Sequence, residues 1–356
     1  MLDIDWDEIL ENLKSGQCVF VLGPELFPSV QCGKSLSDAM QDLLPKKKDN
    51  RDEVAFYRED GFFFFTGSLS QTLNNQLASR LKKFYEPEAS QSKIYEILIE
   101  IPALMYISLS PDCMINEAFE KKRYSYVFDF FNYEKKPNEF DPPSVENPLV
   151  YNLMGCVDDQ NTLILTYDKL FDYLPRIFSK ETEPKSLINE LSKVSRFILL
   201  GFQYDKWYFN LLFRLLGMNK TESNALCNID PKDPNLSFYS RHFRFDFINT
   251  DPQSFLQELT EKCTEQKIPL RSQLNKADPI KRRLLDLLAD LKNNYGKLLD
   301  QIFKDYPILG NEVEEIRIQY KRALTEYNKS GNRQLFDEEE DRVTGRLHDL
   351  INENYD

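Results

Sequence analysis

The sequence predicts an α/β protein in which a doubly wound, mostly parallel sheet is followed by a small C-terminal bundle of helices. Two observations predict this fold. Over residues 1–268, short apolar segments typical of buried strands alternate with amphipathic helical stretches. Beyond residue 276 only helical periodicity remains, with apolar residues three and four positions apart. We therefore expect an α/β domain over residues 1–268 and a helical interaction or oligomerisation module over residues 276–356.

The first domain begins with an amphipathic helix around residues 6–13 and the apolar strand Cys18–Leu22, which Gly23 and Pro24 end. The other predicted strands cover residues 103–108, 149–153, 163–166 and 197–201. The helices that cover them are predicted over residues 69–85, 93–100, 186–194, 207–216 and 254–265. The order of strands and helices is typical of a parallel sheet with helices on both faces.

The C-terminal module is predicted to contain three amphipathic helices, over residues 284–302, 313–327 and 343–350. The apolar residues of the first helix follow the coiled-coil period. Such a bundle is either a self-contained interaction module or a dimerisation arm, and both alternatives stay open. We expect a protein partner or self-association through residues 276–356.

The charge balance argues against nucleic acid as a partner. The chain has 45 Lys and Arg against 58 Asp and Glu, a net charge of -13, whereas phosphate-backbone binding needs clustered cations. The two compact basic runs, at 46–48 and 281–283, are interpreted as solvated surface. No apolar stretch is long enough to span a bilayer, and the first residues are acidic rather than typical of a signal peptide. We expect a cytoplasmic protein that binds neither nucleic acid nor membranes.

The cysteines do not predict a metal site. They stand at positions 18, 32, 113, 156, 227 and 263. None forms a C-x-x-C pair or neighbours a histidine, so the spacing of a zinc site is missing. Cys18, Cys113 and Cys156 lie in or beside apolar strands and are interpreted as small buried side chains. This usage is typical of a reduced, intracellular protein.

The most informative segment runs from Tyr151 to Leu174. It contains a strand ending in Met154-Gly155, an acidic turn, a Leu-rich stretch and a Thr-x-Asp-x-aromatic helix start. It resembles the bacterial sirtuin-like domain family associated with antiphage defence, in which a histidine stands at the position of Met154. A thioether has no exchangeable proton and cannot act as a general base. The reaction expected of that family therefore cannot run from this position.

Two more family signatures are altered. Where the family has a Gly-Ala-Gly-type phosphate loop, this chain has Gly23-Pro24-Glu25. Pro24 removes an amide donor and Glu25 adds negative charge, so both changes oppose binding of a diphosphate. Ser110 stands where the family has the Asn that contacts the nicotinamide ribose, and a hydroxyl cannot reproduce the paired donor and acceptor of an amide.

The remaining positions of the resemblance are kept. Asp112 survives in the second signature, where we interpret it as the cap of the following helix. The strand ending at Gly201 and the following Asp205 resemble the step that closes the pocket, although Asp205 is alternatively a helix cap. The cofactor-binding positions that the resemblance implies, altered or kept, are Gly23, Pro24, Glu25, Ser110, Asp112, Met154, Gly155, Gly201 and Asp205. The resemblance covers roughly residues 1–265, and 149–209 is its most specific part.

The segment from Lys46 to Gly61 interrupts the alternation of strands and helices, and we interpret it as an insertion over the cofactor cleft. A run of four phenylalanines, residues 62–65, follows it. This run either gates a pocket or forms a buried strand, and we prefer the strand.

A retained fold with a lost reaction is what the resemblance and the replacements together imply. The first hypothesis is an inactive sirtuin-like module, not an enzyme, that acts as sensor, adaptor or scaffold in a bacterial antiphage or conflict system. The alternative is an active NAD+ glycohydrolase that depletes NAD, with Glu25, Asp112 and Ser110 in place of the lost groups. A third hypothesis is a pocket that binds NAD or ADP-ribose without turnover.

Two further observations concern the chemistry that the chain can perform. Sirtuin deacylases carry a four-cysteine zinc module, and its absence here argues against protein deacylation. His242 and His348 are the only histidines of the chain. His348 falls in the helical module and His242 precedes the last strand, so we do not expect either to replace the lost histidine.

Overall fold

The computed structural model describes residues 4–26, 40–42, 54–65, 70–85, 93–226, 234–274, 299, 310–330, 339 and 342–347. These residues form two compact units, residues 1–273 and 274–356, which we describe separately. The predicted helix over residues 284–302 lies outside the described residues except for Leu299, and so do both basic runs.

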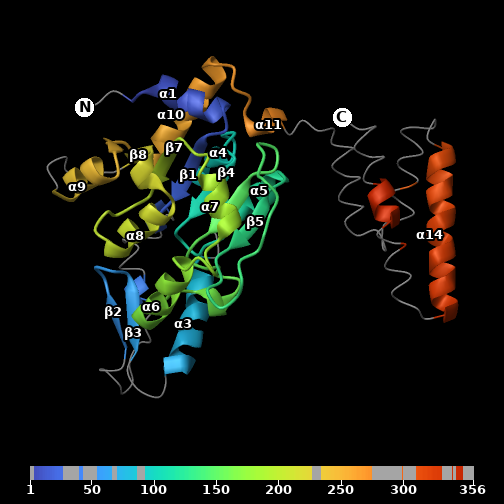
Figure 1. Cartoon of the computed structure of the whole chain (residues 1–356), viewed down its shortest axis with the longest axis horizontal. Coiled ribbons are helices and arrows are strands. Elements are labelled where there is room, and N and C mark those ends of the chain that lie inside the picture. Colours follow the sequence, from blue (N-terminus) through green and yellow to red (C-terminus); the bar gives the residue numbers. More distant parts are fainter. Residues whose placement is uncertain are drawn as a thin grey trace. The chain divides into compact units, whose positions relative to one another are not determined.

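The first unit is built around a seven-stranded sheet in which all pairings are parallel (Figure 1). The strands, in spatial order, are β5 (Val127–Phe130), β6 (Leu149–Asn152), β4 (Met105–Ser108), β1 (Cys18–Leu22), β7 (Arg196–Leu200), β8 (Glu222–Leu226) and β9 (Phe245–Ile248). From β1 the chain forms β4, then β5 at one edge and β6 between β4 and β5, and it then returns to place β7 on the other side of β1. The sheet thus has a topological switch point beside β1, where ligands of open α/β sheets bind.

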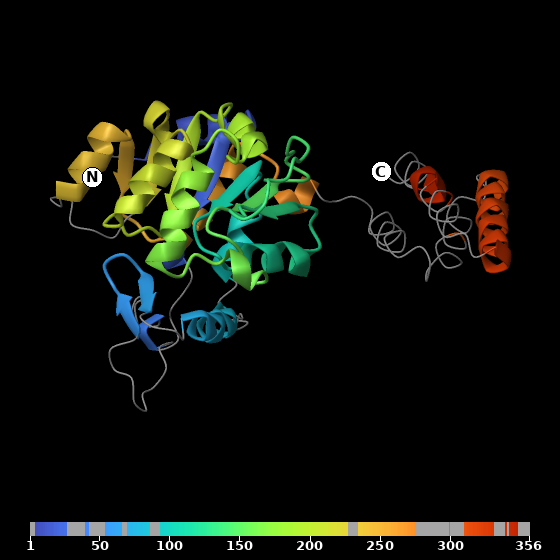
Figure 2. The same ribbon diagram turned by 60° about the horizontal axis from the view of Figure 1, so that its bottom comes forward.

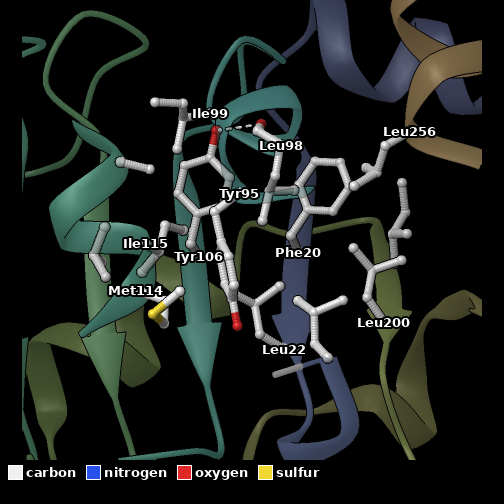
Figure 3. Close-up of a cluster of buried hydrophobic side chains, with 14 of the residues drawn as sticks. Phe20, Leu22, Tyr95, Leu98, Ile99, Tyr106, Met114, Ile115, Leu200 and Leu256 are labelled. Atoms are coloured by element: carbon white, nitrogen blue, oxygen red, sulfur yellow. Dashed lines mark hydrogen bonds between the residues drawn. The ribbon is translucent and has the colours of Figure 1, made fainter. Parts of the chain in front are cut away.

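Helices cover both faces of this sheet, which confirms the predicted doubly wound fold. On one face lie α1 (Trp6–Lys14), α4 (Lys93–Leu98), α5 (Met114–Lys122) and α10 (Pro252–Glu265), and on the other lie α6 (Tyr167–Ile177), α7 (Lys185–Leu191), α8 (Trp207–Leu215) and α9 (Pro234–His242). Alternate residues of β1 enter different cores: Phe20 packs in the first core and Val21 in the second. Figure 3 shows the first core, where Phe20 lies among Tyr106, Leu200 and neighbouring side chains. A strand buried on both faces explains the continuous apolar run at residues 18–22.

The strand predicted over residues 163–166 is wrong. Residues 163–165 extend across the end of the sheet without joining it, and the Leu165 carbonyl accepts the Phe63 amide at 2.8 Å. Thr166 forms a single bridge with Phe63, and its hydroxyl accepts the Lys169 amide at the start of α6. The segment connects the 3-10 turn η2 (Gln160–Thr162) to the cap of α6, and its backbone bonds to Phe63 instead of to a strand of the main sheet.

The phenylalanine run forms strand β3 (Phe62–Phe65), which pairs with β2 (Val54–Tyr57) in an antiparallel hairpin outside the main sheet. Phe62 and Phe63 are buried, whereas Phe64 is 39% exposed. The strand interpretation is therefore correct, but the strand is not buried along its whole length. The hairpin and α3 (Ser70–Tyr85) lie together at one end of the unit (Figure 2).

The side chain of Arg271 fixes the end of the first unit. It lies in the short helix α11 (Arg271–Leu274) and is fully buried. Its guanidinium donates to the carbonyls of Ile99 at 2.8 Å and Ala103 at 2.9 Å, and to that of Val145. The carbonyls of Ile99 and Ala103 precede β4 and that of Val145 precedes β6, so one cation satisfies backbone groups that burial would otherwise leave unpaired.

In the second unit the predicted middle helix is confirmed as α14 (Gly310–Ser330). Ile316 and Tyr320 are buried on it, and Val343 and Leu347, in the described helical turn at residues 342–347, are buried as well. Within the described parts of both units, no helix combines the length and the apolar character that crossing a membrane requires.

We predict that Arg271→Ala lowers the free energy of unfolding of the first unit by about 3 kcal/mol, because several buried carbonyls lose a charged donor. Arg241→Ala is the matched control, since Arg241 is exposed on α9 and its loss should cost less than about 0.5 kcal/mol. Chemical denaturation of both variants measures the difference. Equal stability of the two variants would contradict the role assigned to Arg271.

Candidate functional site

A cavity of about 100 Å³ lies beyond the carboxyl ends of the central strands. Loops that follow four strands contribute to its wall: Pro24 and Glu25 after β1, Pro111 after β4, Met154 after β6, and Gln203 and Lys206 after β7. The hairpin contributes Phe56, Gly61, Phe62 and Phe63, and α3 contributes Leu81 and Tyr85. The cavity thus occupies the switch point of the sheet, where a cofactor is expected in this fold class.

The turn after β1 has no backbone amide left for a phosphate. The Gly23 amide donates to the Leu200 carbonyl at 2.8 Å, the Glu25 amide to the Gly201 carbonyl at 3.0 Å, and the Leu26 amide to the Gly23 carbonyl at 3.1 Å. Pro24 has no N–H group. These residues form the 3-10 turn η1 (Pro24–Leu26), which closes on the loop after β7. An anion site made of backbone N–H groups needs donors that point outward, and this turn offers none.

The retained glycines are explained by close backbone packing. A Cβ atom at Gly23 would lie 2.2 Å from the Gly201 carbonyl oxygen, and one at Gly201 would lie 2.2 Å from the Leu26 nitrogen. Gly201 also has a φ of +74°, a left-handed conformation that favours glycine. Gly155 has a φ of +84°, and its Cβ would lie 2.2 Å from the Thr162 carbonyl oxygen. The glycine framework therefore serves the packing of these turns, whether or not a cofactor binds.

Ser110 and Asp112 are buried, at 2% and 4% exposure, and neither belongs to the described cavity wall. The Asp112 carboxylate accepts the Met114 amide, the first amide of α5, at 3.0 Å, but the N-cap residue is Cys113, so Asp112 binds the helix start from one position before the cap. Burial raises the pKa of Asp112, while the hydrogen bond from the Met114 amide lowers it. The pKa of Tyr85 is raised mainly by the burial of its hydroxyl and further by the negative charge of Asp112.

Met154 does face the cavity, and it is only 7% exposed. Its neighbours in the wall are apolar, among them Leu109, Pro111 and Ile164. His242 does not substitute for the missing imidazole, because it lies at the end of α9, where its ring stacks on Phe238 with centroids 5.2 Å apart. His348 lies outside the described residues. The position that would hold a general base is thus occupied by a buried apolar side chain.

Glu25 and Lys206 are the charged residues of the described cavity wall. Burial raises the pKa of Glu25, the nearby Lys206 ammonium lowers it, and Asp205 raises it. The Lys206 ammonium donates to the carbonyls of Arg58 at 3.1 Å and Glu59, and it lies 4.0 Å from the Asp205 carboxylate. Two carbonyl oxygens therefore accept hydrogen bonds from this ammonium, and the Asp205 carboxylate at 4.0 Å adds an ion pair without a hydrogen bond.

Asp205 is not a helix cap. The N-cap of α8 is Lys206, and no side chain accepts a hydrogen bond from the first turn. The Asp205 side chain is 54% exposed beside the ammonium of Lys206, outside the described cavity wall. The capping alternative failed because α8 begins one residue later than a cap at position 205 requires.

Lys206 and two tyrosines hold the hairpin against the sheet. The Tyr208 hydroxyl donates to the Asp60 carbonyl at 3.3 Å, and the Tyr167 hydroxyl bonds to the Asp60 carboxylate. The Phe62 ring packs between them, with centroids 5.4 Å from Tyr167 and 5.1 Å from Tyr208. The sequence contained no signal for this arrangement, because a lysine or tyrosine at a helix start is ordinarily exposed. The described part of the predicted insertion, residues 54–61, does reach the cavity through Phe56 and Gly61.

Of the predicted cofactor-binding positions, the structure brings Pro24, Glu25 and Met154 together in the cavity wall. Close packing against the backbone of other turns explains Gly23, Gly155 and Gly201. The cavity can enclose a small, largely apolar group, with one carboxyl and one ammonium at its edge. Within the described residues, the amides from Gly23 to Leu26 are engaged and Glu25 stands beside them, so this part of the wall does not fit the diphosphate of a dinucleotide.

Residues 105–236 match the SIR2-like domain family. Residues 105–236 are therefore similar to a SIR2-like domain, as the motif from Tyr151 to Leu174 predicted. A solved structure described as the structural basis for the mechanism and regulation of Sir2 enzymes matches with a TM-score of 0.38 and 10% identity, over 74% of this chain and 98% of that one. A structure of Sir2 with a deacetylated p53 peptide and 3'-O-acetyl ADP ribose matches with a TM-score of 0.33 and 11% identity, over 74% and 98%. No curated protein matches this chain.

We predict that Gly201→Ala lowers the free energy of unfolding by about 3 kcal/mol or more, because the new methyl group meets the Leu26 backbone in a strained conformation. Gly217→Ala is the matched control. Gly217 has a φ of +80° but nothing within 4 Å of a Cβ atom, so only the conformational cost of about 1 kcal/mol applies. Urea denaturation of both variants separates the two effects, and similar losses would show that the close approach is unimportant.

The buried carboxyl of Glu25 predicts a dependence of stability on pH. Because the pKa of Glu25 is raised in the folded chain, ionising this carboxyl costs more free energy in the folded state than in the unfolded state. The free energy of unfolding begins to fall as the pH rises past the ordinary pKa of 4.5, and the whole loss is present above the pKa of the folded chain. Glu25→Gln removes this cost. The variant should therefore gain stability over the natural chain as the pH rises through that window, with the gain constant above it. Denaturation at a series of pH values tests this, and a gain that shrinks with rising pH would contradict it.

Proposed function

We propose that this SIR2-like domain is catalytically inactive and acts as a sensor, adaptor or scaffold. The observation that carries the proposal is the engagement of every amide in the turn after β1, from Gly23 to Leu26. A dinucleotide bound at the switch point would place its diphosphate against this turn and against the Glu25 carboxyl. Opening the turn would break its hydrogen bonds to Leu200 and Gly201, which join β1 to β7.

The loss of reaction groups supports the same proposal. Met154 stands in the cavity where the resembling family has a histidine, and Ser110 is turned away from the described wall. The Lys206 ammonium holds the hairpin turn through Arg58 and Glu59, so its charge is not available to a phosphate. The described residues of the cavity thus supply no imidazole base and no anion site made of backbone amides.

A role in a bacterial antiphage or conflict system rests on the motif resemblance of residues 149–209. In such a system an inactive domain contributes by binding other proteins. The C-terminal residues 276–356 would supply that contact, by self-association or by docking to a partner. Two exposed apolar residues on α14 support this assignment, Ile318 at 44% and Leu324 at 38% exposure, because they lie outside the buried face of the helix.

The rival function is NAD+ hydrolysis by a rebuilt site, and Glu25 is the observation that favours it. A carboxylate in an apolar cavity is suited to stabilise an oxocarbenium-like ribosyl cation. The same burial raises the pKa of Glu25, which lowers the share of the ionised form that such a role needs. We therefore retain this function as the alternative that the experiment must exclude.

The test is incubation of the full chain with NAD, with nicotinamide release followed by chromatography and thermal unfolding recorded in the same buffer. We expect no release above the rate without protein and no shift in the unfolding temperature. Release that disappears in Glu25→Gln would overturn the proposal and establish a hydrolase. An upward shift without release, growing with NAD or ADP-ribose concentration, would show a sensor that binds nucleotide.

A second variant tests the pocket itself. Glu25→Ala removes the negative charge from the cavity wall and should strengthen anion binding if the pocket is used. Because the amides of the turn remain engaged in this variant, we expect ADP-ribose to leave its unfolding temperature unchanged. A shift found only in Glu25→Ala would show that this carboxylate alone excludes the nucleotide.

A further inference from the structure

Three potential metal ligands meet where the loops after β4 and β6 come together. The Cys113 and Cys156 sulfur atoms lie 3.4 Å apart, and the Cys113 sulfur lies 3.7 Å from an Asp158 carboxylate oxygen. The ligand atoms of the three residues all lie within 4.8 Å of one another. The two cysteines are 43 positions apart, which is why their spacing carried no signal of a metal site.

The backbone holds these ligands in place. The Val157 amide donates to the Pro111 carbonyl at 2.9 Å. This hydrogen bond joins the two loops within two residues of each cysteine. The Asn152 side chain donates to the Asp112 carbonyl at 2.9 Å. A turn closed by the Asp159 amide and the Cys156 carbonyl, at 3.0 Å, carries Asp158. The geometry therefore does not depend on flexible side chains alone, which favours a preformed site.

The convergence of three potentially anionic groups favours a cation. The Cys113 and Cys156 sulfur atoms and the Asp158 carboxylate offer ligand atoms that lie within 4.8 Å of one another. A bound divalent cation stabilises two thiolates and a carboxylate together.

We propose that Cys113, Cys156 and Asp158 bind a divalent transition-metal ion of the zinc class. Two thiolates and one carboxylate match the ligand preference of Zn²⁺, and a water molecule would complete a tetrahedral site. With Zn–S bonds of about 2.3 Å, tetrahedral geometry places two sulfur atoms roughly 3.8 Å apart, so the 3.4 Å separation needs only a small adjustment. Binding exchanges protons for the metal: Zn²⁺ and two thiols give a zinc dithiolate and two H⁺.

The site is accessible and it borders the cavity. Cys156 is buried, Cys113 is partly exposed and Asp158 is exposed, so the ion can enter from the side of the carboxylate. The other oxygen of Asp158 forms an ion pair with Lys82 at 2.8 Å, a contact that orients the carboxylate. Because Pro111 and Met154 of the same two loops line the cavity, the ion would stabilise that wall.

The experiment uses the reduced, metal-free full chain and Co²⁺ as a spectroscopic probe. We expect a near-ultraviolet thiolate-to-cobalt charge-transfer band that saturates at one ion per chain and is displaced by Zn²⁺. Affinity should increase with pH, and protons should be released on binding. Cys113→Ser and Cys156→Ser should each lose the saturable band, whereas Cys263→Ser, which removes a buried thiol in the core under α10, should keep it.

The carboxylate has its own control. Asp158→Asn should weaken Co²⁺ binding by more than about 10-fold, because losing a residue that only supports a metal ligand already costs about that much. Asp168→Asn, an exposed change on α6, should leave the Co²⁺ affinity unchanged. Thermal unfolding of each metal-free variant confirms that it is folded. A band retained in both cysteine variants would overturn the proposal. So would a reduced chain that binds no Co²⁺ but forms a Cys113–Cys156 disulfide in air, because the pair would then be a redox pair.

Discussion

The backbone contact between the turns after β1 and β7 is the constraint on which the rest of the domain depends. Both strands lie at the centre of the sheet, and their loops approach so closely that Gly23 and Gly201 have no room for a Cβ atom. The hydrogen bonds that join the two turns also use the amides that a phosphate would need. The same interactions therefore stabilise the centre of the fold and close the anion site.

The hairpin extends this closure to the other side of the cavity. Lys206 is almost completely buried, and burying an ammonium is costly unless oxygen atoms surround it. Here the carbonyls of the hairpin turn supply them, so the charge attaches the hairpin to α8. The same charge therefore contributes to the structure of the domain through these carbonyls.

The carboxyl edge of the sheet still collects side chains with chemistry. Because the strands are parallel, the loops after β4 and β6 meet at this edge regardless of their separation along the chain. That is how Cys113 and Cys156 come into contact beside the cavity. The loop after β6 therefore carries both Met154, which faces the cavity, and Cys156, which meets the loop after β4.

The sequence by itself determined the fold class, the order of the central strands along the chain and the missing histidine, because burial periodicity and local motifs are properties of neighbouring residues. It failed at residues 163–166, where an apolar segment connects a turn to a helix cap, and at β8, whose sequence ESNAL contains too few apolar residues to indicate a strand. Only the tertiary structure decided which amides are engaged, where Lys206 donates and which cysteines meet. Those contacts join residues far apart in the chain, and their partners follow from the order of strands in the sheet.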